Sequence, residues 1–176
     1  MKMSCRIAKI IGLLLFSIML THCGIYSFTG ASIPPGTETF QVKYFINEAG
    51  NRPGSTVEPG LDQDFTIALQ DLLINQTSLN LVTNDADLIY EGEIKQYSIT
   101  PTTSTAENTA AQNRLTMSVN VRYTNIKNNI DSFEQNFSFF YDFDANLQLF
   151  DIKTEAHKII FERITQDIFN ASLAKW

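Results

Sequence analysis

The sequence predicts an α+β fold, a two-layer sandwich in which two helices cover one face of a four-stranded mixed sheet. Two observations predict it: four segments alternate apolar and polar residues as half-buried strands do, and two segments repeat apolar residues at helical spacing. Their order along the chain is β-α-β-β-β-α. The first three elements therefore form a β-α-β unit, for which we expect a right-handed crossover.

Residues 1–22 have the pattern of a lipoprotein signal peptide. The apolar run Ile10–Leu20 is too short to span a bilayer as a helix. Basic residues precede this run: Lys2, Arg6 and Lys9. Cys23 closes the leader and is followed by glycine, as in a lipobox, so we expect Cys23 to be the lipid attachment site. His22 departs from the small residue typical before that cysteine, and a plain secretory leader is the alternative.

Residues 23–36 have no regular period and end in Pro34-Pro35-Gly36, which favours an extended N-terminal tether. Residues 37–176 are then a single α+β domain. Because Gly24 stands where an aspartate would signal inner-membrane retention, we expect the outer membrane. Two or three acyl chains on Cys23 would anchor the protein stably, whereas one chain alone binds marginally.

The charge balance excludes two classes of protein. The 176-residue chain has 13 basic and 19 acidic residues, and the three bases of the leader leave 10 against 19, a net charge of −9. So acidic a domain is a poor non-specific nucleic-acid binder and a poor polybasic membrane-surface protein. Since Cys5 lies in the leader, the mature chain keeps Cys23 alone, which excludes a disulfide framework.

The first half of the domain alternates strand, helix and strand. Residues 37–47 form the first predicted strand, and residues 48–60 a Gly/Pro/Asn-rich loop. Residues 63–77 form an amphipathic helix with Asp62 as its N-cap. The inward face of the strand comprises Phe40, Val42, Tyr44 and Ile46. The apolar face of the helix comprises Phe65, Ala68, Leu69, Leu72 and Leu73.

The second strand starts at residues 79–83, is interrupted by the turn residues 84–86, and resumes from Leu88 to about Thr100. Residues 101–113 are predicted to be an exposed loop. The segment 114–123 alternates most regularly, and an Asn128-Asn129 turn joins it to a last strand at 133–143, which predicts an antiparallel hairpin.

The final helix follows a connector at 146–153, is capped by Thr154 or Asp151, and runs almost to Trp176. Its predicted buried stripe comprises Ala156, Ile160, Ile164, Ile168 and Ala171, flanked by Ile159 and Phe161.

The mature chain carries no recognisable catalytic motif, so we expect no enzyme, no metal and no cofactor. Its sole histidine is His157, for which a solvated or partly packed place on the last helix is the simpler interpretation. The run Asp142-Phe-Asp144-Ala-Asn146 resembles the start of a calcium loop but lacks the later glycine and glutamate. The remaining acidic cluster is expected to be a solvated face: Asp85, Asp87, Glu91 and Glu93.

The run from Cys23 to Ile33 (CGIYSFTGASI) and the β-α-β-β-β-α order resemble the LptE-type lipopolysaccharide-assembly lipoproteins. The resemblance covers essentially the whole mature chain and implies two helices on a four-stranded sheet. It also implies a non-enzymatic outer-membrane lipoprotein that partners a large β-barrel protein and helps it insert lipopolysaccharide into the outer leaflet. The domain would lie on the periplasmic side or inside the partner barrel. Cys23 carries over as the lipidation site.

Direct contact with lipopolysaccharide would need basic residues within this acidic domain. The sheet face away from the helices carries Lys43, Lys95, Arg114 and Arg122, and the last three are the candidate lipopolysaccharide contacts. The simpler alternative is that they are ordinary solvated strand residues. A second function, a free-standing lipoprotein that binds an amphiphile or a cell-wall fragment, predicts a deep apolar pocket between sheet and helices.

Overall fold

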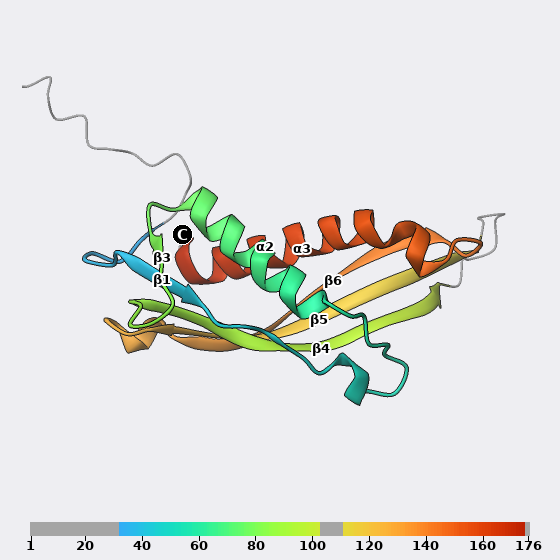
Figure 1. The fold of residues 1–176 in the computed structure, drawn as a ribbon, viewed down its shortest axis with the longest axis horizontal. Helices are drawn as coiled ribbons and strands as arrows, with labels where there is room; N and C mark the ends of the chain where they lie inside the picture. The colour runs from blue at the N-terminus through green and yellow to red at the C-terminus, as the bar shows by residue number, and fades with distance from the viewer. Residues whose placement is uncertain (1–31, 103–110, 175–176) are drawn as a thin grey trace, which may run out of the picture. The chain divides into compact units, whose positions relative to one another are not determined.

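The computed structural model describes residues 32–102 and 111–174. Cys23, the leader and residues 24–31 of the tether lie outside the described residues. Figure 1 shows both helices over one face of a mixed sheet, which confirms the predicted α+β class and two-layer arrangement. Among the described residues, neither helix combines the length and hydrophobicity needed to cross a membrane.

Strand pairing mixes parallel and antiparallel contacts. The elements in chain order are β1 (Thr39–Val42), β2 (Ile46–Asn47), the short helix η1 (Ala49–Asn51), α2 (Leu61–Gln76), β3 (Asn80–Leu81), β4 (Leu88–Thr102), β5 (Gln112–Asn125), the short helix η2 (Asn129–Asp131), β6 (Phe133–Asp144) and α3 (Leu149–Leu173). The sheet order is β3-β1-β4-β5-β6, and β2 also pairs with β4. β1 and β2 run parallel to their neighbours, whereas β4, β5 and β6 form an antiparallel meander.

Within the described residues the sheet has six strands instead of the predicted four, because each of the first two predicted strands is divided. The first is interrupted at residues 43–45. There Phe45 turns into the core, and its N–H donates to the Thr66 hydroxyl at 3.2 Å. The alternation changes face at this point, so Tyr44 and Ile46, predicted inward, are 59% and 57% exposed.

The second predicted strand becomes β3 and β4, which flank β1 on opposite sides. Asp87, just before β4, accepts hydrogen bonds from the N–H groups of Glu38 (2.8 Å) and Thr39 (3.1 Å) and so ties the start of β4 to β1. The predicted loop at 101–113 is shorter at both ends, because Pro101 and Thr102 of β4 pair with Asn113 and Gln112 of β5.

A bulge between Ile94 and Gln96 shifts the register of β4 against β5. The extra residue moves the inward face from even-numbered to odd-numbered positions. Tyr97 therefore points into the core, where it is fully buried.

Both helices begin earlier than predicted. α2 starts at Leu61 with Gly60 at the N-cap, so Asp62 lies in the first turn and does not cap the helix. α3 starts at Leu149 with Gln148 as the cap. The carboxylate of Asp151 accepts the backbone N–H of Gln148 at 3.0 Å and completes a capping box. Both predicted caps, Thr154 and Asp151, therefore lie inside the helix, and Asp151 takes part in the capping box from the third helical position.

The hydrophobic core fills the layer between helices and sheet. The apolar stripes of both helices meet the inward faces of β1, β4 and β5, and the fully buried members include Phe40, Phe45, Phe65, Leu69, Leu73, Tyr90, Ile94, Val119, Ile160, Ile164 and Ile168. Edge-to-face rings join the two helices to each other and α2 to the segment between β1 and β2: Phe65 lies 5.6 Å from Phe161 and 5.1 Å from Phe45, centroid to centroid. This packing leaves the opposite sheet face as the polar surface of the domain.

Candidate functional site

The candidate site is the face of β4, β5 and β6 turned away from the helices. Antiparallel register aligns its side chains in rows that cross the three strands. From one end to the other, the rows are Glu91-Arg122-Glu134, Glu93-Asn120-Asn136, Gln96-Ser118-Ser138, Ser98-Thr116-Phe140 and Thr100-Arg114-Asp142. The face is thus charged at both ends and uncharged in the middle.

Lys95 and Arg122 meet at one end of this face through a shared carboxylate. Glu93 contacts Lys95 at 2.6 Å and Arg122 at 3.5 Å. Lys95 also binds Glu48 at 2.7 Å, and Arg122 contacts Glu91 at 3.4 Å. The Lys95 ammonium lowers the pKa of the Glu93 carboxyl, and the bonds to Glu48 and Glu93 raise the pKa of Lys95. The opposite charges of Lys95 and Glu93 thus stabilise each other.

Arg114 lies at the other end of β5, eight residues from Arg122, or about 27 Å along a strand. Its guanidinium forms a bidentate pair with Asp142 at 2.7 and 2.8 Å, and it covers the Phe140 ring at 3.7 Å from the centroid. Of the three predicted lipopolysaccharide contacts, the structure thus brings Lys95 and Arg122 together and leaves Arg114 apart.

The three basic residues each face carboxylates, so a phosphate ligand would have to compete with Glu93, Glu91 or Asp142. Their contact with lipopolysaccharide stays a prediction. Sequence reasoning missed the acidic partners, although a signal was present: opposite charges recur on the outward positions of strands that the hairpin pattern pairs.

The acidic and calcium-like residues also have structural partners. Asp142 binds Arg114, Asp144 accepts from Asn146 at 2.9 Å, and Asp87 holds the start of β4. In the part of the chain that the structure describes, no three His, Cys, Asp or Glu residues are placed to share a metal ion.

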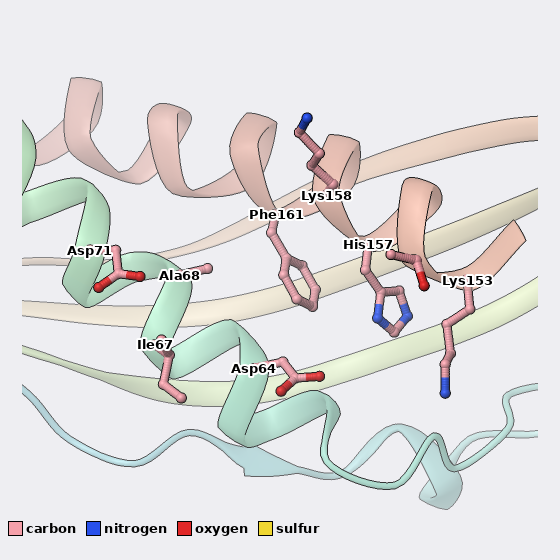
Figure 2. A pocket seen from close by; sticks show the side chains of 9 residues that line it. Asp64, Ile67, Ala68, Asp71, Lys153, His157, Lys158 and Phe161 are labelled. Carbon is pink, nitrogen blue, oxygen red and sulfur yellow. The ribbon is translucent and has the colours of Figure 1, made fainter.

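A second feature is a groove of about 410 Å³ between α2 and α3 (Figure 2). Asp64 and Asp71 stand on its α2 side, and Lys153 and Lys158 on its α3 side, so its walls carry opposite charges. The groove runs between the two helices and not between helices and sheet. This groove is therefore not the deep apolar pocket between sheet and helices that an amphiphile carrier would need, because core side chains fill the layer beneath it.

His157 lies at the base of this groove and is 9% exposed. One ring nitrogen, Nε2, is 2.8 Å from the Tyr97 hydroxyl, and the ring stacks on Phe161 at 5.1 Å. Burial lowers the pKa of His157, an effect that the charge of Glu58 opposes. Burial also raises the pKa of Tyr97. Both shifts favour the neutral form of the side chain at pH 7. His157 is thus a packed residue of the core rather than a solvated one.

The sequence model of the LptE family, described as lipopolysaccharide-assembly, matches residues 37–172. No curated protein sequence matches the chain.

Among solved structures, the hypothetical protein CT253 from Chlamydia trachomatis is 14% identical, with 80% of this chain and 100% of that chain covered and a TM-score of 0.52. A minor lipoprotein from Acinetobacter baumannii is 14% identical over 80% and 98% of the two chains, with a TM-score of 0.45. The rare lipoprotein B from Shewanella oneidensis is 11% identical over 74% and 89%, with a TM-score of 0.41.

The likeness to the Chlamydia protein shows a shared fold, and at this identity it shows no more. The family match is the stronger finding, because residues 37–172 include all the strands that the structure describes and nearly all of α3. The chain therefore belongs to the LptE family of lipopolysaccharide-assembly proteins.

Proposed function

We propose that this protein is an outer-membrane lipoprotein that acts without catalysis, as the partner of a β-barrel protein that delivers lipopolysaccharide to the outer leaflet. The observation that carries the proposal is the family match over residues 37–172, which is the whole predicted domain apart from its last four residues. Family membership supports a role in lipopolysaccharide assembly. The β-barrel partner, the lipid anchor and the location in the outer membrane are the further parts of the proposal.

The anchor rests on the sequence. A basic segment, a short apolar run and Cys23-Gly24 make residues 1–22 a lipoprotein signal peptide, and acylated Cys23 would hold the domain at the membrane. Residues 23–36 would then link the anchor to β1. Ser32 donates its N–H to the Leu173 carbonyl and Ile33 packs against the core, so residues 23–31 would remain as the linker. Nine residues span at most about 32 Å when extended, so the domain would stay close to the membrane surface.

The folded domain suits a binding role. Its core is packed, and its polar face is held by ion pairs between neighbouring strands. Lys95 and Arg122 would contribute to binding a lipopolysaccharide phosphate by releasing Glu93, and the guanidinium could then bind phosphate in a bidentate manner. Arg114 would be a separate contact, because its distance from Arg122 excludes a shared phosphate.

Purification of the tagged, acylated full chain from outer membranes in mild detergent tests the proposal. We expect a stoichiometric β-barrel protein to accompany it and bound lipopolysaccharide to be present. Repeated recovery of the monomer alone would contradict a barrel partner. Cys23→Ser should lose the acyl mass and leave the membrane fraction, and unchanged membrane partition would contradict the anchor.

The phosphate contact has its own test. Photo-crosslinking to lipopolysaccharide should weaken in the double variant Lys95→Gln/Arg122→Gln. Lys158→Gln, an exposed charge change on the helix side, is the matched control and should leave crosslinking unchanged. Equal crosslinking by the double variant and the wild type would show that these residues are ordinary strand residues.

A further inference from the structure

β6 is an edge strand of the sheet, with β5 on one side and no strand on the other among the described residues. The N–H of Ala145, directly after β6, donates to the carbonyl of Ala111 beside β5 at 3.0 Å. The β5–β6 register is continuous, so odd-numbered residues of β6 direct their backbone groups toward β5. The even-numbered residues, including Asn136, Ser138 and Phe140, direct theirs to the free edge.

These free-edge groups form no backbone hydrogen bonds with other described residues. Edge strands are usually protected by short length, by charged side chains (lysine above all), by proline, or by a bulge. β6 is 12 residues long, contains no proline and no lysine, and pairs with β5 without a bulge. By contrast, the opposite edge strand, β3, has two residues. The β6 edge is thus long and regular enough to pair with another strand, and its carboxylates oppose only a strand of like charge.

A groove of about 290 Å³ lies beside β6, between this strand and α3. Phe139 and Ile159 supply its apolar surface, and Ile159 is 36% exposed. Arg163 and Gln166 add polar groups from α3. A strand added at the β6 edge would continue the sheet beneath α3, and its inward side chains would enter this groove.

Charge indicates what kind of strand fits. β6 carries Glu134, Asp142 and Asp144 and no basic residue. Asp142 is paired with Arg114, so Glu134 and Asp144, together with Glu162 of the groove, supply the negative charge at this edge. Two β6 strands of separate copies would bring acids against acids, in proteins that each carry a net charge of −9 once the leader is removed. An extended segment with lysine or arginine is the complementary occupant. A closed barrel wall has no free strand to offer, so the segment belongs outside the wall.

We propose that β6 is the docking edge of this protein, where an extended basic segment of its β-barrel partner pairs with the strand through the free backbone groups of Asn136, Ser138 and Phe140. This inference rests on the proposed function for the identity of the partner. It adds the contact surface and the mode of recognition, which is strand addition with main-chain hydrogen bonds.

The test uses the acylated full chain with its co-purifying β-barrel protein. Asn136→Pro removes a free-edge N–H and places a ring where the added strand would lie, while the bonds to β5 are kept. Asn136→Thr is the matched control, because it changes the side chain and retains the N–H. We expect recovery of the barrel to fall roughly tenfold or more with proline and to persist with threonine.

Two charge-reversal variants test the docking edge independently of the proline substitution. Glu134→Lys should lower recovery of the barrel, because it sets a base against the basic segment. Glu155→Lys, the same charge change at an exposed position of α3, should not. Circular dichroism and thermal unfolding of each purified variant are the check that the fold is retained. In the wild-type complex, the amides of Asn136, Ser138 and Phe140 should gain protection from hydrogen exchange.

The outcomes separate the two proposals. Undiminished barrel recovery with both Asn136→Pro and Glu134→Lys would overturn β6 docking and leave the proposed function intact. A wild-type chain that recovers no barrel would overturn the proposed function and, with it, the docking edge. A wild-type dimer that Asn136→Pro dissociates would overturn the choice of partner and make a second copy the occupant.

Discussion

Replacing Tyr97 by phenylalanine tests whether His157 is a structural residue. The hydroxyl of Tyr97 and Nε2 of His157 are 2.8 Å apart, in a site where the tyrosine is fully buried and the histidine is 9% exposed. Tyr97→Phe removes one partner and leaves a buried ring nitrogen without a hydrogen bond. Such a group costs about 1–3 kcal/mol of the free energy of unfolding. That is a large share of the 5–15 kcal/mol typical of a domain.

His157→Phe should cost a similar amount, because the buried Tyr97 hydroxyl then lacks its partner while the stacking on Phe161 is retained. The double variant replaces both polar groups by apolar rings and should approach the stability of the wild type. A double-mutant cycle, measured by urea unfolding at pH 8, should therefore show a coupling of about 2–6 kcal/mol, the sum of the two single-variant losses.

Additive losses in this cycle would refute the reasoning, because they would mean that the two groups do not depend on each other. The same cycle addresses catalysis. If His157→Phe retained the stability of the wild type but abolished a cellular function of the protein, an enzymatic role for this histidine would have to be reconsidered.

Three further predictions concern pH and packing. Backbone N–H donors and Lys127 hold the pKa of Asp87 at about 2 instead of 3.8, so the stability that this carboxylate contributes is present above pH 3.8 and is lost as pH falls through 2. Asp87→Asn should therefore reduce the fall of the melting temperature between pH 4 and pH 2 in thermal unfolding. An unchanged fall over this range would contradict the assignment. The pKa of His157 is lowered, so its contribution should be lost as pH falls below 6.5, and His157→Phe should remove this dependence in urea titrations at pH 8 and pH 5. Phe65→Ala should cost about 3–5 kcal/mol in urea unfolding, since the ring is fully buried between two others, and a loss under about 1 kcal/mol would mean that the site is not packed as described.

The fold class could be predicted because periodicity is a local property of the sequence. The alternation in 114–123 predicted the buried face of β5 correctly, from Leu115 to Tyr123. The spacing of Ala156, Ile160, Ile164 and Ile168 likewise predicted the buried stripe of α3. In both segments one unbroken period runs the length of the element, so local pattern and tertiary burial agree.

The errors lie where the period changes. Phe45 leaves the alternation of the first strand to fill the core beside Gly92, where a Cβ would lie 2.8 Å from the Phe45 ring. The bulge between Ile94 and Gln96 turns Tyr97 inward toward His157. Neither shift has a local signal, because each is stabilised by a partner more than twenty residues away in the sequence.

The sequence alone was sufficient for the order of elements, the family resemblance, the expected anchor at Cys23 and the list of basic residues on the outer sheet face. Tertiary structure alone decided how those residues are combined. Strand register places Glu93 between Lys95 and Arg122 and sets Asp142 beside Arg114, and the strand order leaves β6 with a free edge among the described residues. The physical reason is that a side chain's face follows from its own strand, whereas its neighbours follow from which strand lies alongside and in what register.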